Sequence, residues 1–434
     1  MDEATLSAGG NLRLGRRVMD RLDALAAYTS EAPALTRLYL TPEHAAAAAR
    51  VRGWMEEAGL ATEIDAAGNV VGRKAGGRDD APILLLGSHI DTVRDGGRYD
   101  GNLGVVAAIE AVAALDGPLP FAIEVIAFGD EEGVRFPVTL TGSRAVAGTL
   151  DAAHFEAADR DGVTLGAALA AFGGDPVAAR ALGRAPGRVA AYVEIHIEQG
   201  PVLEAEGLPV GIVTAIAGAT RLEVVVTGMA GHAGTVPMAL RRDAGAAAAE
   251  MVIAVEAVAR ERPEIVATVG RIEFGPGAVN VVPGRAVFTV DLRSPDDGRR
   301  TAALADVGER IAAIAARRGV GVESRVFYSE AAAPCHPALI DALSGAVERI
   351  GVPPRRLVSG AGHDGLAMIA LCPIGMVFVR CAGGISHNPA EAIEVEDADA
   401  AVRVLIEFLR AFDPARLRAA ASDGGSADAS RLRK

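Results

Sequence analysis

Residues 83–132 decide the fold, and they read ILLLGSHIDTVRDGGRYDGNLGVVAAIEAVAALDGPLPFAIEVIAFGDEE. The apolar run at 83–86 predicts a buried strand, residues 102–115 predict a helix, and the run at 121–128 predicts a second strand. A strand, a helix and a strand in this order are typical of an α/β domain with a mixed, mostly parallel sheet flanked by helices. Two further apolar runs predict strands of the same sheet, at 190–197 and 374–379.

The residues before this stretch predict a helix and then a hairpin. Thr41 suits the N-cap of the helix, Pro42 suits its first turn, and Gly59 is a plausible end. Residues 61–72 then alternate in polarity around a Gly-Asn turn, which is typical of two antiparallel strands.

The expected order of elements changes between about 217 and 328. The pattern predicts a strand, a helix, two strands, a helix and a strand, at 221–227, 243–260, 265–274, 285–293, 300–318 and 321–327. This order is that of a ferredoxin-like α+β unit. We therefore expect a discontinuous domain, 1–216 with 329–415, an inserted domain, 217–328, and a flexible tail, 416–434. The junctions near 214–219 and 328–334 would act as hinges for closure over a substrate.

Composition excludes several classes of protein. Of the 434 residues, 50% are hydrophobic and 23% are charged, which excludes global disorder. The formal net charge of −13 lacks the basic footprint of a nucleic-acid binder. No apolar run approaches the ~20 residues of a membrane-spanning helix, so no membrane partner is expected. Three cysteines without a CxxC motif favour a reducing, cytoplasmic location.

Imidazoles and carboxylates gather where the predicted strands end. They are His89, Asp91, Asp100, Glu131, Glu132, His196 and His387. In open α/β sheets ligands bind outside the carboxyl ends of the strands, so these side chains are expected to meet. Packed carboxylates need a counter-charge, and histidine with aspartate or glutamate suits Zn²⁺ or Mn²⁺. Five ligands with one bridging carboxylate would hold two ions.

Other catalytic motifs are weak or missing. Residues 360–365 match GxGxxG, but they come late in the chain and lack a convincing acidic partner about 20 residues on, which disfavours a dinucleotide site. The chain has no GxSxG and no HExxH motif, which disfavours a serine nucleophile and a zincin.

Five motifs carry a resemblance to a known family. They are GSHIDTV at 87–93, GRYDG at 97–101, DEEG at 130–133, EIHIEQGP at 194–201 and GGISHNP at 383–389. Together they resemble the dinuclear-metal amidohydrolases of the M20 peptidase superfamily, over residues 40–412. The resemblance is greatest to the branch of allantoate amidohydrolases, N-carbamoyl-L-amino-acid hydrolases and β-ureidopropionases. It implies a zinc-aminopeptidase-like catalytic domain and an inserted lid and dimerisation domain.

The resemblance also implies two divalent metal ions per subunit, zinc or manganese. His89, Asp100 and His196 would hold one ion, and Glu132 and His387 would hold the other, with Asp100 bridging both. Asp91 would orient His89 through its other ring nitrogen. Glu131 would be the general base, since a carboxylate beside activated water can take its proton and pass it to the leaving nitrogen.

The inserted domain carries further implied roles. His232, in a GHAGT segment, would stabilise the oxyanion, often across the interface of a homodimer. Asn280 and Arg293 resemble substrate-binding residues, and an arginine can clamp a carboxylate bidentately. By the same analogy the remaining substrate contacts are Gln199, Gly360 and His363.

The implied reaction is hydrolysis of a ureido or carbamoyl C–N bond in a small anionic substrate, releasing ammonia and CO2. Phe136-Pro137 after the acidic pair favours allantoate, with an N-carbamoyl-L-amino acid or a β-ureido acid as the alternative. A peptidase or aminoacylase is disfavoured by His196 and the EQGP run. A catalytically inactive metal-binding homologue is disfavoured by Glu131, which such a protein has no reason to keep.

Overall fold

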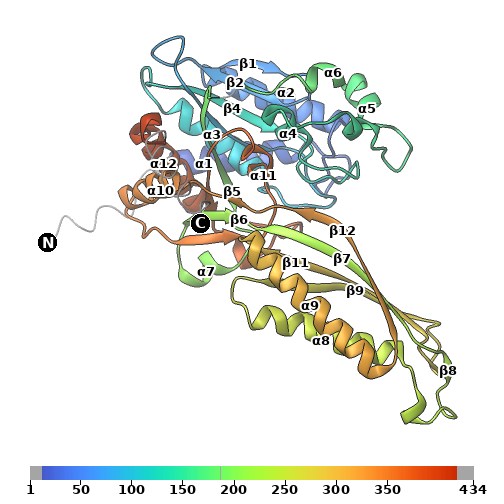
Figure 1. Ribbon diagram of the computed structural model, residues 1–434. Helices are drawn as coiled ribbons and strands as arrows, with labels where there is room; N and C mark the ends of the chain where they lie inside the picture. The colour runs from blue at the N-terminus through green and yellow to red at the C-terminus, as the bar shows by residue number, and fades with distance from the viewer. Residues whose placement is uncertain (1–11, 186, 418–434) are drawn as a thin grey trace, which may run out of the picture. The chain divides into compact units, whose positions relative to one another are not determined.

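The chain folds into two compact units in the computed structural model, which describes residues 12–185 and 187–417 (Figure 1). Unit 1 takes in the described residues up to Thr214, then Cys335–Leu357, and those from His363 onward. Unit 2 comprises Ala215–Pro334 and Val358–Gly362. Apart from its first two residues, the predicted tail 416–434 lies outside the described residues.

Four parallel strands form the centre of the large sheet of unit 1. Their order is β4 (Ala122–Phe128), β3 (Ile83–His89), β5 (Val189–Ile197) and β15 (Ile374–Val379). Most of their residues are buried, as expected for parallel strands covered on both faces. These are the four strands that the apolar runs predict, and the predicted fold class is confirmed.

Antiparallel strands extend the sheet on both sides. On one side β2 (Val70–Lys74) pairs with β4, and β1 (Ala61–Ile64) pairs with β2, which is the predicted hairpin. On the other side β6 (Val210–Ile216) pairs with β15. Two shorter strands pair with β6: β13 (Ala333–Pro334) and β14 (Arg356–Ser359). Strand β13 and the last two residues of β6 and of β14 belong to unit 2. Sequence analysis did not predict β6, β13 or β14.

Helices flank this sheet. The crossover from β3 to β4 is α3 (Asn102–Ala113), which is buried along nearly its whole length and packs against α1 (Arg13–Ala26) and α12 (Val395–Ala411). Helix α10 (Pro337–Arg349) packs on α12, and α2 (Pro42–Glu57) packs on β1 and β2. The shorter helical segments are α4 (Thr141–Ala147), η2 (Ala152–Glu156), α5 (Leu165–Phe172), α6 (Pro176–Ala179), α7 (Val202–Glu206), α11 (Gly365–Met368) and η4 (Ala382–Gly384).

Unit 2 has a four-stranded antiparallel sheet, in the order β12 (Gly321–Glu330), β7 (Gly218–Thr227), β11 (Arg285–Ser294) and β9 (Val266–Gly275). Two long helices, α8 (Ala244–Arg260) and α9 (Asp297–Arg318), bury their apolar residues against the sheet (Figure 1). These six elements follow the β-α-β-β-α-β order that the sequence predicts. The smaller elements are β8 (Gly231–His232), η3 (Met238–Leu240) and β10 (Val281–Val282).

Within the part of the chain that the structure describes, no helix combines the length and the apolar character needed to cross a membrane.

A buried histidine on α2 makes the stability of unit 1 depend on pH. His44 is fully buried between the rings of Tyr39 and Phe172, and neither ring nitrogen has a hydrogen-bond partner among the described residues. Burial, assisted by the charge of Arg37, lowers the pKa of His44 to about 3. The unfolded chain therefore takes up this proton first, and stability is lost as the pH falls below about 6.5.

We expect this single group to lower the free energy of unfolding by about 2 kcal/mol between pH 7 and pH 5. The His44→Leu variant should lack that part of the decrease. Urea unfolding can be followed by the fluorescence of Trp54, which is the only tryptophan of the chain and is buried on the same helix. Equal pH dependence in the variant and the wild type would contradict this interpretation.

Candidate metal centre

The carboxyl ends of the four parallel strands bring five of the predicted residues together. His89 is the last residue of β3, and His196 lies near the end of β5. Glu132 follows β4, His387 follows β15, and Asp100 lies just before α3. His89, His196 and Asp100 are buried, whereas about half of the His387 side chain is exposed. The structure thus brings these five side chains together at the ends of the strands, where the sequence leads us to expect them.

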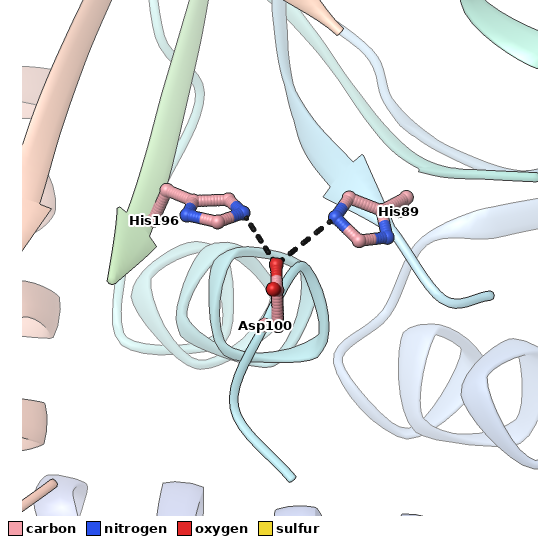
Figure 2. Close-up of side chains that lie close together, drawn as sticks. All are labelled: His89, Asp100 and His196. Carbon is pink, nitrogen blue, oxygen red and sulfur yellow. Dashed lines mark ion pairs between the residues drawn. The ribbon is translucent and has the colours of Figure 1, made fainter. Parts of the chain in front are cut away.

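Asp100 lies at the centre of the cluster, and its two oxygens face different partners. Oδ1 is 3.4 Å from His89 Nε2 and 3.0 Å from His196 Nε2 (Figure 2). Oδ2 is 3.2 Å from His387 Nε2, which in turn is 3.6 Å from Glu132 Oε2. The carboxylate thus separates the cluster into two groups that share only Asp100.

Each of these two groups has the geometry to hold a cation. One potential ligand atom from each member lies within 4.8 Å of those from the others, both for His89, Asp100 and His196 and for Asp100, Glu132 and His387. Glu132 Oε1 is buried and has no hydrogen-bond partner among the described residues. Such an unpaired oxygen is costly unless a cation or a donor meets it. The donor set of imidazoles and carboxylates fits a divalent metal, and we conclude that this cluster binds one.

The charges of the cluster point the same way. Burial, together with the charge of the neighbouring Asp100 carboxylate, raises the pKa of Glu132 to about 7. Burial also opposes ionisation of Asp100, but hydrogen bonds from His196, His387 and His89 outweigh it and hold the pKa of Asp100 well below its usual range. A divalent cation would supply the positive charge that lets both carboxylates stay ionised.

The glycine after Asp100 allows the chain to pass close to the ring of His89. Gly101 caps α3 with a φ of 66°, which is a left-handed conformation that favours glycine. A Cβ atom at this position would collide with the ring of His89. The GRYDG motif therefore needs its last glycine for packing as well as for backbone conformation.

Glu131 lies next to Glu132 and takes part in a third group, with His89 and Glu132. Burial raises the pKa of Glu131 well above its ordinary value, and the carboxylates of Glu132 and Asp364 raise it further. A carboxylate with a raised pKa beside a metal site has the basicity that a general base requires.

Asp91 holds the acidic turn in place. Its Oδ1 accepts the backbone N–H of Glu131 at 3.2 Å, and its Oδ2 accepts that of Glu132 at 3.3 Å. The other ring nitrogen of His89, Nδ1, lies 3.0 Å from the backbone carbonyl oxygen of Asp91 and 3.7 Å from its carboxylate. Asp91 therefore meets His89 most closely through its main chain, which sequence patterns do not distinguish from the side chain.

Two predicted substrate contacts of unit 1 touch the cluster. Gln199 donates from Nε2 to Asp100 Oδ2 at 2.9 Å and to Ser386 Oγ at 3.1 Å. The ring of His363 packs edge-on against that of His196, with centroids 4.3 Å apart. Burial lowers the pKa of His363 well below its ordinary value, so this ring is neutral.

The other predicted site residues lie in unit 2, and they are His232, Asn280, Arg293 and Gly360. His232 on β8 is exposed and pairs with β10, and the carbonyl oxygen of Asn280 accepts the N–H of Ala233 at 2.9 Å. Arg293 donates to both carboxylate oxygens of Asp291, at 2.7 and 3.0 Å, and to the carbonyl oxygen of Gly360 at 2.6 Å.

Sequence analysis missed other residues that support the site. Glu194 lies two residues before His196 on β5, and its Oε1 accepts a hydrogen bond from Ser88 at 2.8 Å. The alternation of a strand could have found it. Arg37 donates to the Ile90 carbonyl at 2.7 Å, and burial lowers its pKa to about 10. No sequence signal pointed to Arg37.

Comparison with known proteins gives a consistent result. The model of peptidase family M20/M25/M40 matches residues 85–411. An N-carbamoyl-L-amino acid amidohydrolase of Geobacillus stearothermophilus is 43% identical, over 90% of this chain and 97% of that protein. An allantoate deiminase of Arabidopsis thaliana is 41% identical, over 90% of this chain and 81% of that protein.

A solved structure agrees with these relatives. A hydantoinase/carbamoylase family amidase of Burkholderia multivorans has a TM-score of 0.85 and 35% sequence identity, with 91% of this chain and 97% of that chain covered. The predicted resemblance is confirmed, and the chain belongs to the peptidase family M20/M25/M40.

Proposed function

We propose that this chain hydrolyses a ureido C–N bond, with allantoate as the preferred substrate. The observation that carries the proposal is the placement of Glu131 beside a cluster in which Asp100 is shared by two ligand groups. Relatives about 40% identical over most of the chain, named allantoate deiminase and N-carbamoyl-L-amino acid amidohydrolase, support the same class of enzyme. Their names also disfavour a peptidase.

The two groups that share Asp100 would each hold one divalent ion, zinc or manganese. His89 and His196 complete one group, and Glu132 and His387 complete the other. When bound, such ions polarise a carbonyl oxygen and lower the pKa of water, so that a nucleophile forms near neutral pH. Asp91 accepts hydrogen bonds from the backbone of Glu131 and Glu132, and these would keep both side chains directed at the site.

Glu131 would move the proton. It would take a proton from the attacking water as the new C–O bond forms, and deliver it to the nitrogen that leaves. A ureido group R–NH–CO–NH2 and one water then give R–NH2, ammonia and CO2, so that atoms balance. The raised pKa of Glu131 suits a group that must both accept and return a proton.

Arg293 would bind the carboxylate of the substrate. A guanidinium has five N–H groups, and three of them are directed at Asp291 and Gly360, which leaves two for a ligand. Asn280, Gln199, Gly360 and His363 would be further contacts. In this proposal unit 2 serves as lid and dimerisation domain of a homodimer, and His232 stabilises the oxyanion.

The location we propose is the cytoplasm. The three cysteines, Cys335, Cys372 and Cys381, are buried free thiols, and burial raises their pKa values to about 12, 12 and 11. Protonated, buried thiols are compatible with a reducing compartment.

Ammonia release from allantoate and from a series of N-carbamoyl-L-amino acids, measured side by side on zinc- and manganese-loaded protein, tests the proposal. We expect kcat/KM for allantoate to be at least tenfold higher than for any carbamoyl amino acid. The reverse order would favour the alternative substrate, an N-carbamoyl-L-amino acid, which the relative from Geobacillus supports. Activity on neither class would reject the proposed function, and dipeptide hydrolysis would then favour a peptidase.

A further inference from the structure

Glu391, a carboxylate outside both ligand groups, connects the segments that carry two of the proposed ligands. It is buried, with 4% of its surface exposed. Its Oε1 accepts the backbone N–H of Tyr99 at 2.9 Å and that of Asp100 at 3.1 Å. Its Oε2 accepts the hydroxyl of Ser386 at 3.0 Å, and Ser386 is the residue before His387. One side chain thus touches the segment before α3 and the loop after β15.

These contacts determine how Asp100 is presented. The backbone N–H groups of Tyr99 and Asp100 both donate to the same oxygen of Glu391, and these two hydrogen bonds fix the main chain there. Ser386 Oγ is also 3.1 Å from Asp100 Oδ2, the oxygen that faces His387. The hydroxyl has one hydrogen, so it donates to one of the two carboxylates at a time.

The chain makes room for this side chain. A Cβ atom on Gly97 would collide with the carboxylate of Glu391, so the first glycine of the GRYDG motif is needed for the contact. The backbone of Glu391 is held as well, since its N–H donates to the Asn388 carbonyl at 3.0 Å. The space beside Gly97 and the hydrogen bond to Asn388 together fix the position of the Glu391 carboxylate.

We propose that Glu391 is a positioning residue that holds Asp100 and the His387 loop in register for metal binding. This inference rests on the proposed function, because it concerns the same ligand groups. What matters in this proposal is the length of the Glu391 side chain and its acceptor oxygens, rather than the negative charge that it adds to the site. Side-chain length and charge can be changed separately by mutation.

The test compares Glu391→Gln with Glu391→Asp in the full chain. Glutamine keeps the length, an oxygen for the two N–H groups and an amide for Ser386, but loses the charge. Aspartate keeps the charge but is one methylene too short. We expect Glu391→Asp to weaken the apparent affinity for Zn²⁺ at least tenfold, measured on the metal-free chain by competition with a chelating dye. Glu391→Gln should stay within about threefold of the wild type.

Asp243 provides the control, since it is a carboxylate of unit 2 that accepts two backbone N–H groups, those of Gly245 and Ala246, at the start of α8. Asp243→Ala should lower the melting temperature and leave zinc affinity unchanged. Wild-type affinity in Glu391→Asp, or a greater loss in Glu391→Gln, would overturn the inference, and so would an equal loss in the control. The readout uses no substrate, so a chain inactive on every ureido compound would reject only the proposed function.

Discussion

Replacing Glu131 with glutamine is expected to lower kcat for ureido hydrolysis by about 10²- to 10⁴-fold and to leave the bound metal in place. Glutamine has nearly the same shape, but it cannot accept the proton from water. Because Glu131 is not a member of the two groups that share Asp100, its loss should not empty the site. Ammonia release and the metal content per chain measure the two effects separately.

The neighbouring residue provides the matched comparison. Glu132→Gln changes the same functional group one position along, yet Glu132 belongs to one of the proposed ligand groups. That variant should lose metal as well as activity. If Glu131→Gln retained wild-type turnover, or if it lost metal to the same extent as Glu132→Gln, Glu131 would not be the general base.

The largest effect on metal content is expected at Asp100. Its two oxygens face both groups, so Asp100→Ala removes a ligand from each, whereas His387→Ala removes a ligand from one. After dialysis against buffer free of metal, Asp100→Ala should retain essentially no zinc, and His387→Ala should retain about half of the wild-type amount. Elemental analysis of the purified chains gives both values.

Two results would contradict the shared role of Asp100. The first is equal zinc retention in Asp100→Ala and His387→Ala, and the second is wild-type retention in Asp100→Ala. The fluorescence of buried Trp54 serves as the folding control, because that residue lies on α2 of the same unit and outside the cluster.

Local patterns predicted the elements that are defined by local chemistry. The four parallel strands are short apolar runs, and the six elements of unit 2 alternate between strand and helix periods. Helix α12 was missed although Val402, Leu405 and Leu409 recur at helical spacing and are buried, so its signal was present in the sequence. The short strands β13 and β14 exist only through pairing with β6, which no local pattern specifies.

The same distinction holds at the site. His89, His196 and Glu132 could be placed because strand ends converge in an open sheet, and the family motifs then supplied their roles. The sequence does not predict the roles of Glu391 and Arg37, because most of their hydrogen-bond partners are backbone atoms that are distant in sequence. A sequence records which side chains are present, whereas main-chain acceptors and donors become visible only once the chain has folded.

The ligand groups draw on separate stretches of the chain, and this arrangement links metal loading to folding. Cations bound by these two groups would close several long loops at once, because the ligands His89, Asp100, Glu132, His196 and His387 are far apart in the sequence. The unfolded chain cannot bind the ions in this way. Chelation should therefore make the protein easier to digest with proteases as well as inactive. The cell's supply of divalent metal would then govern how long the enzyme survives in addition to how fast it works.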